Sequence, residues 1–411
     1  MSESAALEQE SKLGMILSKV PEVTLFFWII KVLCTTVGET AADFLNVNLN
    51  LGLTLTSVII GVLFLGALFT QFKTKKYTPV VYWLTVILIS VFGTLVTDNL
   101  SDNLHVPLEY STIFFAIILS ITFAVWYMKE KTLSIHSIFT RRREAFYWLA
   151  ILFTFALGTA SGDLMAESLG LGYLTTGLII AAVIAMFAIG WRVGLNAILS
   201  FWFIYIMTRP LGASIGDFLT QAPVNGGLGL GPTNTTIIFV LGIIGTVTYL
   251  SLSHKDIVKD PVAEEEQDEK QGKNAFWQLA VVVVLLLTIS IGGYYFRHHQ
   301  LQQEAAASAA TSSTGVIQTG PLGDVSNFTQ LSQATLDSVS TGDWATANTH
   351  VDAIEFAWDN AQARLKPMNG ARWTQIDGDL DKVFREVRAV NPNQQTAAKA
   401  LQVLLTDLKS F

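Results

Sequence analysis

One short stretch occurs four times in this chain, and its first copy reads FWIIKVLCTTVGETAADFL at residues 27–45. Three segments align with it without a gap: YWLTVILISVFGTLVTDNL from residue 82, YWLAILFTFALGTASGDLM from residue 147 and FWFIYIMTRPLGASIGDFL from residue 201. Every copy opens with an aromatic residue and tryptophan, has glycine ten residues after the tryptophan, and has aspartate five residues after the glycine. Self-similarity of this kind indicates a repeat architecture.

Each copy continues through a short loop into a second apolar segment, over roughly 54–71, 112–128, 174–191 and 235–251. A helix that spans a bilayer needs about 20 mainly apolar residues, so every copy should cross the membrane twice, and all copies should enter from the same side. Only 14% of the residues are charged, whereas soluble proteins average about 25%. We predict an all-α integral membrane protein with an eight-helix core of four parallel two-helix repeats at 23–252.

Beyond the core, a charged connector at 253–275 leads to a ninth apolar segment at 276–296, which we predict to be a further transmembrane helix. A flexible linker at 297–325 follows. Residues 326–411 then show apolar side chains spaced by three and four, as along Val351, Ile354, Trp358, Ala361 and Leu365. This spacing is typical of amphipathic helices and predicts a small antiparallel bundle of four helices. Residues 1–22 form a polar N-terminal segment.

The basic residues predict the orientation of the spans. The loops that follow the repeat aspartates contain no Lys or Arg, whereas the opposite loops contain Lys73, Lys75, Lys76 and Arg141–Arg143. Because short cytoplasmic loops are enriched in Lys and Arg, we expect a cytoplasmic N-terminus and an extracytoplasmic C-terminal bundle. The repeat tryptophans would then form an aromatic belt at the cytoplasmic interface, with each aspartate roughly 22 Å further in.

Ionisable residues stand inside the apolar segments: the four repeat aspartates, Glu39 and Arg209. A charged side chain at the bilayer centre costs about 2.5–3.5 kcal/mol on insertion scales, so these side chains should face an interior cavity around a pseudo-symmetry axis. The residue four before each aspartate lies on the same helix face, which adds Thr94 and Thr159. The repeat glycines should let the helices approach closely, and Pro210 should open the first helix of the fourth copy near Gly212.

Clustered carboxylates repel one another, and a bound cation or proton relieves the repulsion. Oxygen ligands suit hard divalent ions such as Mn²⁺, Mg²⁺ and Ca²⁺. With Thr94 and Thr159 hydroxyls nearby and Arg209 as an internal counter-ion that pairs with Glu39 or Asp217, the predicted metal ligands are Glu39, Asp43, Asp98, Asp163 and Asp217. Two alternatives remain: the aspartates cap helix ends, or Glu39 and Arg209 form a purely structural ion pair.

The segments GETAADFL, GTLVTDNL, GTASGDLM and RPLGASIGDFL, with the Leu-Gly elements that follow three of them, resemble a family of bacterial multi-pass membrane proteins built from tandem copies of a short repeat of unknown function. The resemblance covers about residues 20–252. The second copy departs from it, with His105-Val106-Pro107 where the others have glycine. The resemblance implies a location in the bacterial plasma membrane and brings no agreed activity.

Taken together, the residues favour a transporter or channel for a small cation, above all a hard divalent metal such as Mn²⁺, with proton coupling left open. We expect no resident cofactor and no nucleic-acid partner, because no basic patch is interleaved with aromatics. The bilayer is the expected partner, while a homo-oligomer and an external ligand of the C-terminal bundle stay open. No catalytic motif is visible, so we expect no enzyme. The alternative is a non-transporting receptor or signalling anchor.

Overall fold

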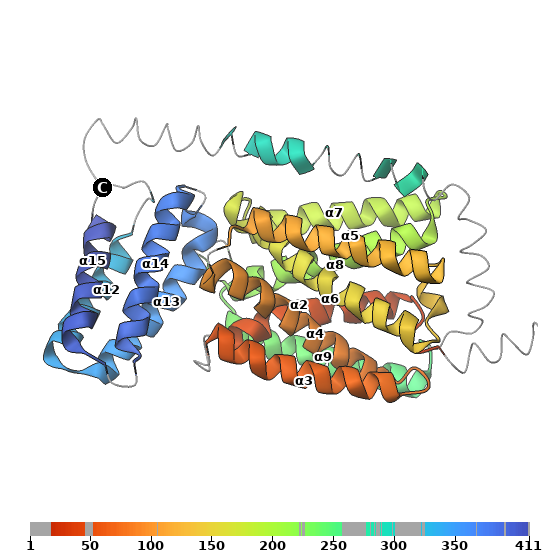
Figure 1. Cartoon of the computed structure of the whole chain (residues 1–411), viewed down its shortest axis with the longest axis horizontal. Helices are drawn as coiled ribbons and strands as arrows, with labels where there is room; N and C mark the ends of the chain where they lie inside the picture. The colour runs from red at the N-terminus through yellow and green to blue at the C-terminus, as the bar shows by residue number, and fades with distance from the viewer. Residues whose placement is uncertain are drawn as a thin grey trace, which may run out of the picture. The chain divides into compact units, whose positions relative to one another are not determined.

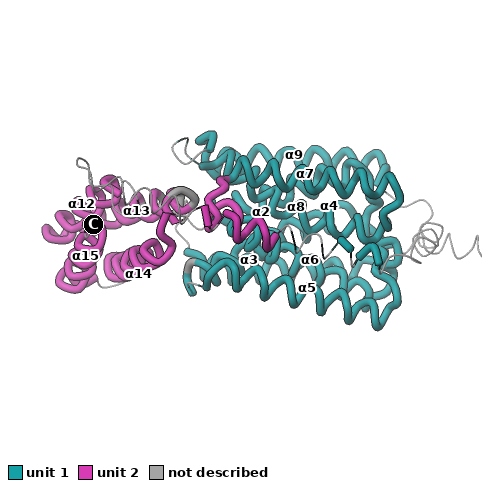
Figure 2. Tube along the Cα trace, turned by 90° about the horizontal axis from the view of Figure 1, so that it is seen from above, with its two compact units in different colours: residues 1–164, 173–288 teal, residues 165–172, 289–411 magenta. Residues whose placement is uncertain are grey.

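The computed structural model describes residues 18–45, 52–104, 106–221, 223, 227–256, 277–279, parts of 281–300, 322, 325–366, 368–389 and 392–409. The chain forms two compact units, residues 1–164 with 173–288 and residues 165–172 with 289–411, which Figure 2 distinguishes by colour. Of the ninth span predicted at 276–296, only parts are described. The connector from 257 to 276 and the linker from 301 to 320 lie outside the described residues.

Eight helices of the described chain are long and apolar enough to cross a membrane, which confirms the predicted eight-helix core. In chain order these helices are α2 (Leu25–Asp43), α3 (Leu53–Lys73), α4 (Pro79–Asp98), α5 (Leu108–Glu130), α6 (Arg141–Asp163), α7 (Tyr173–Arg192), α8 (Ala197–Thr220) and α9 (Gly231–Ser253). Helix α4 continues into a short π-helical turn, η2 (Asn99–Asn103), and α6 continues into another, η4 (Leu164–Ser168). A 3-10 turn, η3 (Ile135–Ser137), precedes α6.

The first helices of the four repeats form an inner ring. In this ring α2 and α6 each pack against both α4 and α8. Each second helix lies outside and packs against the first helix of the following repeat, α3 on α4, α5 on α6 and α7 on α8, and α9 closes the ring on α2 (Figure 1). Over the most apolar 18 residues of each helix, 56–61% of the residues are buried in the inner helices and 17–28% in the outer helices. The outer helices therefore present the apolar surface that suits contact with lipid.

The inner ring is tight because each repeat glycine meets a side chain of the next inner helix. A Cβ added to Gly158 would lie 2.5 Å from Cγ of Arg209, closer than two carbon atoms can pack. All four contacts use the same register, in which the partner stands three residues before the glycine of its own repeat. They pair Gly38 with Ser90, Gly93 with Phe155, Gly158 with Arg209 and Gly212 with Thr35. This confirms that the glycines permit close approach of the helices.

Of the four repeat tryptophans, Trp28 is only partly buried, whereas the other three do not form the aromatic belt expected from the sequence. Trp83, Trp148 and Trp202 are buried, with 1%, 2% and 5% exposure. The indole N–H of Trp202 donates to the carbonyl of Leu133 at 3.0 Å. These tryptophans belong to the inner helices, so neighbouring helices cover them and the outer helices supply the surface. The expectation was wrong because a belt requires side chains on the outside of the bundle.

The C-terminal unit contains four amphipathic helices, α12 (Ser326–Thr341), α13 (Trp344–Leu365), α14 (Gly370–Val387) and α15 (Gln394–Lys409). Helix α12 packs against α13 and α15, and α14 packs against the same two helices. The predicted apolar stripes meet in one core, in which the rings of Trp358 and Trp373 stack with centroids 3.8 Å apart. The side chains of Asp343 and Asn369 cap the starts of α13 and α14. The predicted four-helix bundle is confirmed.

Candidate functional site

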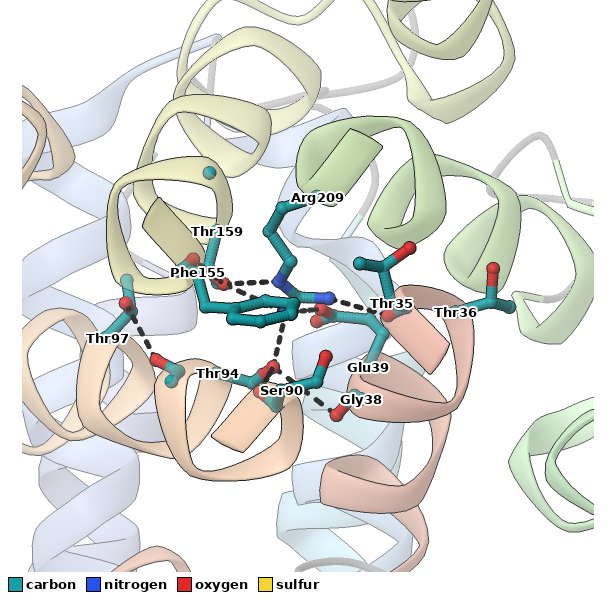
Figure 3. Close-up of polar contacts among 12 residues, drawn as sticks. Thr35, Thr36, Gly38, Glu39, Ser90, Thr94, Thr97, Phe155, Thr159 and Arg209 are labelled. Carbon is teal, nitrogen blue, oxygen red and sulfur yellow. Dashed lines mark hydrogen bonds and ion pairs between the residues drawn. The ribbon is translucent and has the colours of Figure 1, made fainter. Parts of the chain in front are cut away.

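Arg209 of α8 lies inside the inner ring and bonds to the three other inner helices. Its side chain is fully buried. The Nη1 group donates to the backbone carbonyl of Thr35 at 2.7 Å, and the Nη2 group donates to Oε2 of Glu39 at 2.5 Å. The Nε and Nη2 groups both donate to the hydroxyl of Thr159, at 3.0 and 2.8 Å. Nη2 also donates to the hydroxyl of Thr94 (Figure 3). We call these five residues the axial cluster.

The axial cluster follows the repeat register. Glu39, Thr94 and Thr159 all stand one residue after the glycine of their repeat, on α2, α4 and α6. The fourth such position is Ala213 of α8, which has no polar side-chain group. Arg209, one helical turn earlier on the same helix, supplies the cation that joins the other three. Three copies of the repeat therefore place side-chain oxygen atoms at the same height in the inner ring. The fourth copy departs from this pattern and places the positive charge of Arg209 among them.

The cluster is a set of oxygen atoms around a buried cation. One carboxylate, two hydroxyls and one carbonyl receive the guanidinium, and Glu39 itself is only 7% exposed. Charge-assisted bonds of this kind are strong, and two buried opposite charges are tolerated only when they pair and their remaining bonds are satisfied. Of the two partners predicted for Arg209, Glu39 and Asp217, the structure shows the pairing with Glu39. Oxygen sets of this composition also suit hard metal ions.

The repeat aspartates lie one turn beyond the axial cluster. Asp43, Asp98 and Asp163 are the last residues of α2, α4 and α6 and are partly exposed, whereas Asp217 is buried three residues before the end of α8. Among the described residues, no three His, Cys, Asp or Glu side chains could together hold a metal ion. The structure thus does not bring Glu39 and the four aspartates into one five-carboxylate site.

Helix geometry explains this separation. Four residues advance a helix by about 6 Å and turn it about 40° past a full revolution, so a residue at i+4 lies further along the axis and rotated away from it. The level closest to Arg209 is that of Glu39 and the two threonines. The buried hydroxyl of Thr36 on α2 is not part of the cluster, since it donates to the carbonyl of Val32 on its own helix.

Pro210 does not open helix α8, contrary to the expectation from the sequence. The helix runs from Ala197 to Thr220 with Pro210 inside it. The proline ring instead takes part in the close contact between α8 and α6, where a Cβ on Gly158 would lie 2.9 Å from its Cδ and one on Gly162 would lie 3.3 Å from its Cβ. The glycines of α6 leave the room that the ring requires.

Lys31 is a buried charged residue that the sequence interpretation missed. It is 1% exposed on α2, and its ammonium lies 3.7 Å from the ring centroid of Phe155 and 4.0 Å from that of Tyr205. Ammonium groups are attracted to aromatic faces at such distances. The available signal was that only Lys31 and Arg209 are basic within the four aligned copies. Further from the axial cluster, the hydroxyls of Tyr82 and Tyr147 are 2.5 Å apart.

An eight-helix ring of apolar helices, built from four two-helix repeats, defines a multi-pass membrane repeat protein. The chain belongs to the family described as Repeat of Unknown Function (DUF347), which matches residues 26–77, 81–132, 146–193 and 200–256, more than half of its length. Each matched segment holds one inner helix and the outer helix that follows it. No curated protein and no solved structure matches the chain.

Proposed function

We propose that this protein transports a small hard cation across the membrane, with Mn²⁺ as the first candidate, and that the ion binds at the axial cluster. One observation carries the proposal: oxygen atoms from α2, α4 and α6 already surround a cation, the guanidinium of Arg209, in the buried interior of the inner ring. Intramembrane ionisable residues that face a bundle interior commonly mark an ion pathway.

Arg209 would act as a tethered counter-ion. When no ion is bound, its guanidinium neutralises Glu39 and so avoids an uncompensated buried carboxylate, which would cost about 3–5 kcal/mol. An incoming divalent ion would compete with the guanidinium for the Glu39 carboxylate and for the hydroxyls of Thr94 and Thr159. Both the loaded and the empty protein then keep Glu39 paired, as a carrier needs when it returns without its ion.

The four repeat aspartates would concentrate cations at the mouth of the pathway. They stand at or near the ends of the inner helices, one turn beyond the Glu39 level. A cleft lined by one sign of charge raises the local concentration of its counter-ion. From the distribution of Lys and Arg among the loops, we place this end outside the cell, in a plasma membrane, with the N-terminus in the cytoplasm.

Ion uptake into proteoliposomes tests the proposal. We expect wild-type protein to take up Mn²⁺, and Glu39→Gln to lower the uptake by more than about tenfold, because a buried neutral amide replaces the carboxylate bonded to Arg209. Thr94→Val should lower uptake less. Thr36→Val is the matched control, since that buried hydroxyl bonds only to its own helix. Failure of wild-type protein to take up Mn²⁺, Mg²⁺ or Ca²⁺ would refute transport.

The mouth aspartates need a separate test. Asp98→Asn and Asp163→Asn should weaken uptake most at low ionic strength, because screening by salt removes long-range attraction between exposed charges. Uptake that is unchanged in both variants at every salt concentration would remove the aspartates from the pathway. It would leave the axial cluster untouched.

A receptor or signalling anchor is the second candidate, because the C-terminal unit is a separate four-helix bundle with its own apolar core. Deleting residues 300–411 separates the two functions. A transporter should keep its Mn²⁺ uptake after the deletion, since the inner ring lies entirely within the other unit. Under the receptor hypothesis, the deletion should abolish every cellular phenotype of the protein.

A further inference from the structure

Lys31 is a buried cation that the pairing described so far leaves without a role, unlike Arg209 and unlike Lys19, which is buried in an ion pair with Glu144. Arg209 is bonded to Glu39. Lys31 has no carboxylate within ion-pair distance among the described residues, and its ammonium rests against the faces of two rings instead. Burying an ammonium without a paired carboxylate is costly, so a protein that keeps a lysine at this position needs a reason for it.

The other titratable groups around Lys31 come from every helix packed on this part of α2. Cys34 of α2 itself and Tyr205 and Arg209 of α8 lie next to it, and Tyr82 of α4 and Tyr147 of α6 lie next to Tyr205. On the opposite side of α2, helix α9 brings Tyr249, whose ring packs on Phe26. Cysteine and tyrosine side chains are neutral near pH 7. Arg209 is therefore the charged group that Lys31 meets, and it is a like charge.

Phe155 relates the surroundings of Lys31 to those of Arg209. Phe155, whose ring receives the ammonium of Lys31, stands at the same repeat position as Arg209, three residues before the glycine of its repeat. It is drawn among the residues of the axial cluster in Figure 3. A positive charge in the axial cluster therefore lies at the level of the inner ring where Phe155 contacts Lys31. In this apolar interior, charges interact far more strongly than in water.

We infer that Lys31 is the proton-exchange group of this transporter, an inference that rests on the proposed function. When a divalent ion enters the axial cluster, the ammonium of Lys31 gives up one proton to water and becomes a neutral amine. When the ion leaves, the amine takes a proton back. No other covalent bond changes. Coupling of this kind is reciprocal, so loss of the proton must strengthen ion binding by the same factor.

The two basic residues would then have different tasks that follow from their chemistry. A guanidinium stays protonated in proteins, so Arg209 can serve only as a fixed counter-ion. A lysine ammonium is a compact charge that can lose its proton when it is buried. The competing role for Lys31 is a permanent charge that only packs against Phe155 and Tyr205. That role predicts no link between its protonation and ion binding.

The affinity of the full chain for Mn²⁺ in detergent, measured by electron paramagnetic resonance from neutral to alkaline pH, distinguishes these roles. We expect the wild-type affinity to rise by up to about tenfold per pH unit, the limit for one proton released per ion bound. Lys31→Met should bind Mn²⁺ with no such dependence, and Lys31→Arg should bind weakly throughout. Lys76→Met, at an exposed lysine, should behave like wild type.

Two further measurements keep the outcome decisive. Size-exclusion profiles establish that the variants are folded, and Lys31→Gln provides a second neutral side chain in case Lys31→Met does not fold. A pH dye inside proteoliposomes should report proton movement opposite to Mn²⁺ in wild type and none in either neutral variant. Uptake of Mn²⁺ with wild-type pH dependence in these variants would overturn the role of Lys31 and leave transport standing. Absence of Mn²⁺ uptake by wild type would remove both.

Discussion

The two helical units of this protein differ in the charged groups that they bury. The membrane unit buries Arg209, Glu39 and Lys31 and exposes apolar side chains such as Val62 and Leu178, which are 65% and 63% exposed. The C-terminal bundle buries a continuous apolar core and carries polar residues outside. A charge inside the bundle would lower its stability, because burial of apolar surface is the main term that favours its folding. In the membrane unit the surroundings are apolar as well, so charged groups are hidden inside and their presence there points to function.

The units also hold together differently. In both units large aromatic side chains fill the space between helices, such as Trp358 and Trp373 in the bundle and Trp83 in the membrane unit. In the membrane unit, glycines let the inner helices touch, because lipid tails are as apolar as the side chains and burial alone gains little. Close packing and buried polar contacts therefore carry the association of the inner ring. Substitutions of the same kind should have different consequences in the two units.

The largest effect is expected from Arg209→Met. Removing the guanidinium leaves the buried carboxylate of Glu39 without a partner, and breaking a buried ion pair in this way costs about 3–5 kcal/mol. We expect a clear loss of thermal stability of the full chain in detergent. The double variant Arg209→Met with Glu39→Gln should recover much of the loss, because no charge is then left unpaired. Equal stability of wild type and the single variant would show that the pair is not what holds the ring.

The second effect concerns the glycine contacts. Gly158→Ala would place a Cβ 2.5 Å from Cγ of Arg209 and should cost about 1–3 kcal/mol, as overpacking usually does. Gly66→Ala on the outer helix α3 is the control, since no atom lies within 4 Å of its added Cβ. There alanine should be neutral or stabilise by up to about 1 kcal/mol, because it is the better helix former. If both substitutions had the same effect, close approach would not be the basis of the ring.

Much of this fold could be predicted from the sequence because the signals are local. Apolar length located the eight spans, spacing by three and four located the bundle helices, and the repeat identified Gly38 and its equivalents as contact positions. The aspartates are the strongest mark of the repeat, yet the structure gathers Glu39, Thr94 and Thr159 around Arg209 instead. That choice depends on how each helix is rotated in the ring, which no spacing within one helix determines.

The contacts of Lys31 likewise could not be predicted from the sequence. No acidic residue stands three or four positions away from it on α2, so the sequence suggests no partner. Its contacts are two rings from α6 and α8, more than a hundred residues further along the chain. The tryptophans were misplaced for a related reason. Their position near the helix ends favoured an interface belt, but only the assembled ring determines whether a helix is inner or outer.

The smallest expected effect is a gain of stability, and it concerns a buried carboxylate of the C-terminal bundle. Asp379 is the one buried carboxylate among the described side chains of that unit. Burial raises the pKa of its carboxyl, the nearby Asp407 adds to the rise, and the ammonium of Lys382, 2.8 Å away, opposes it. Because the folded state holds this proton more tightly than the unfolded state, the free energy of unfolding falls as the pH rises from 3.8 through the raised pKa and stays reduced above it.

Asp379→Asn should therefore stabilise the bundle at neutral pH, with a rise in Tm below about 5 °C, and the gain should shrink as the pH falls toward 3.8. Circular dichroism of a fragment covering residues 322–411 measures it, with Asp337→Asn at an exposed position as the control. Neutralising a buried charge would then help in the bundle and harm in the inner ring. A loss of stability for Asp379→Asn at neutral pH would mean that the bundle, like the membrane unit, depends on a charge inside it.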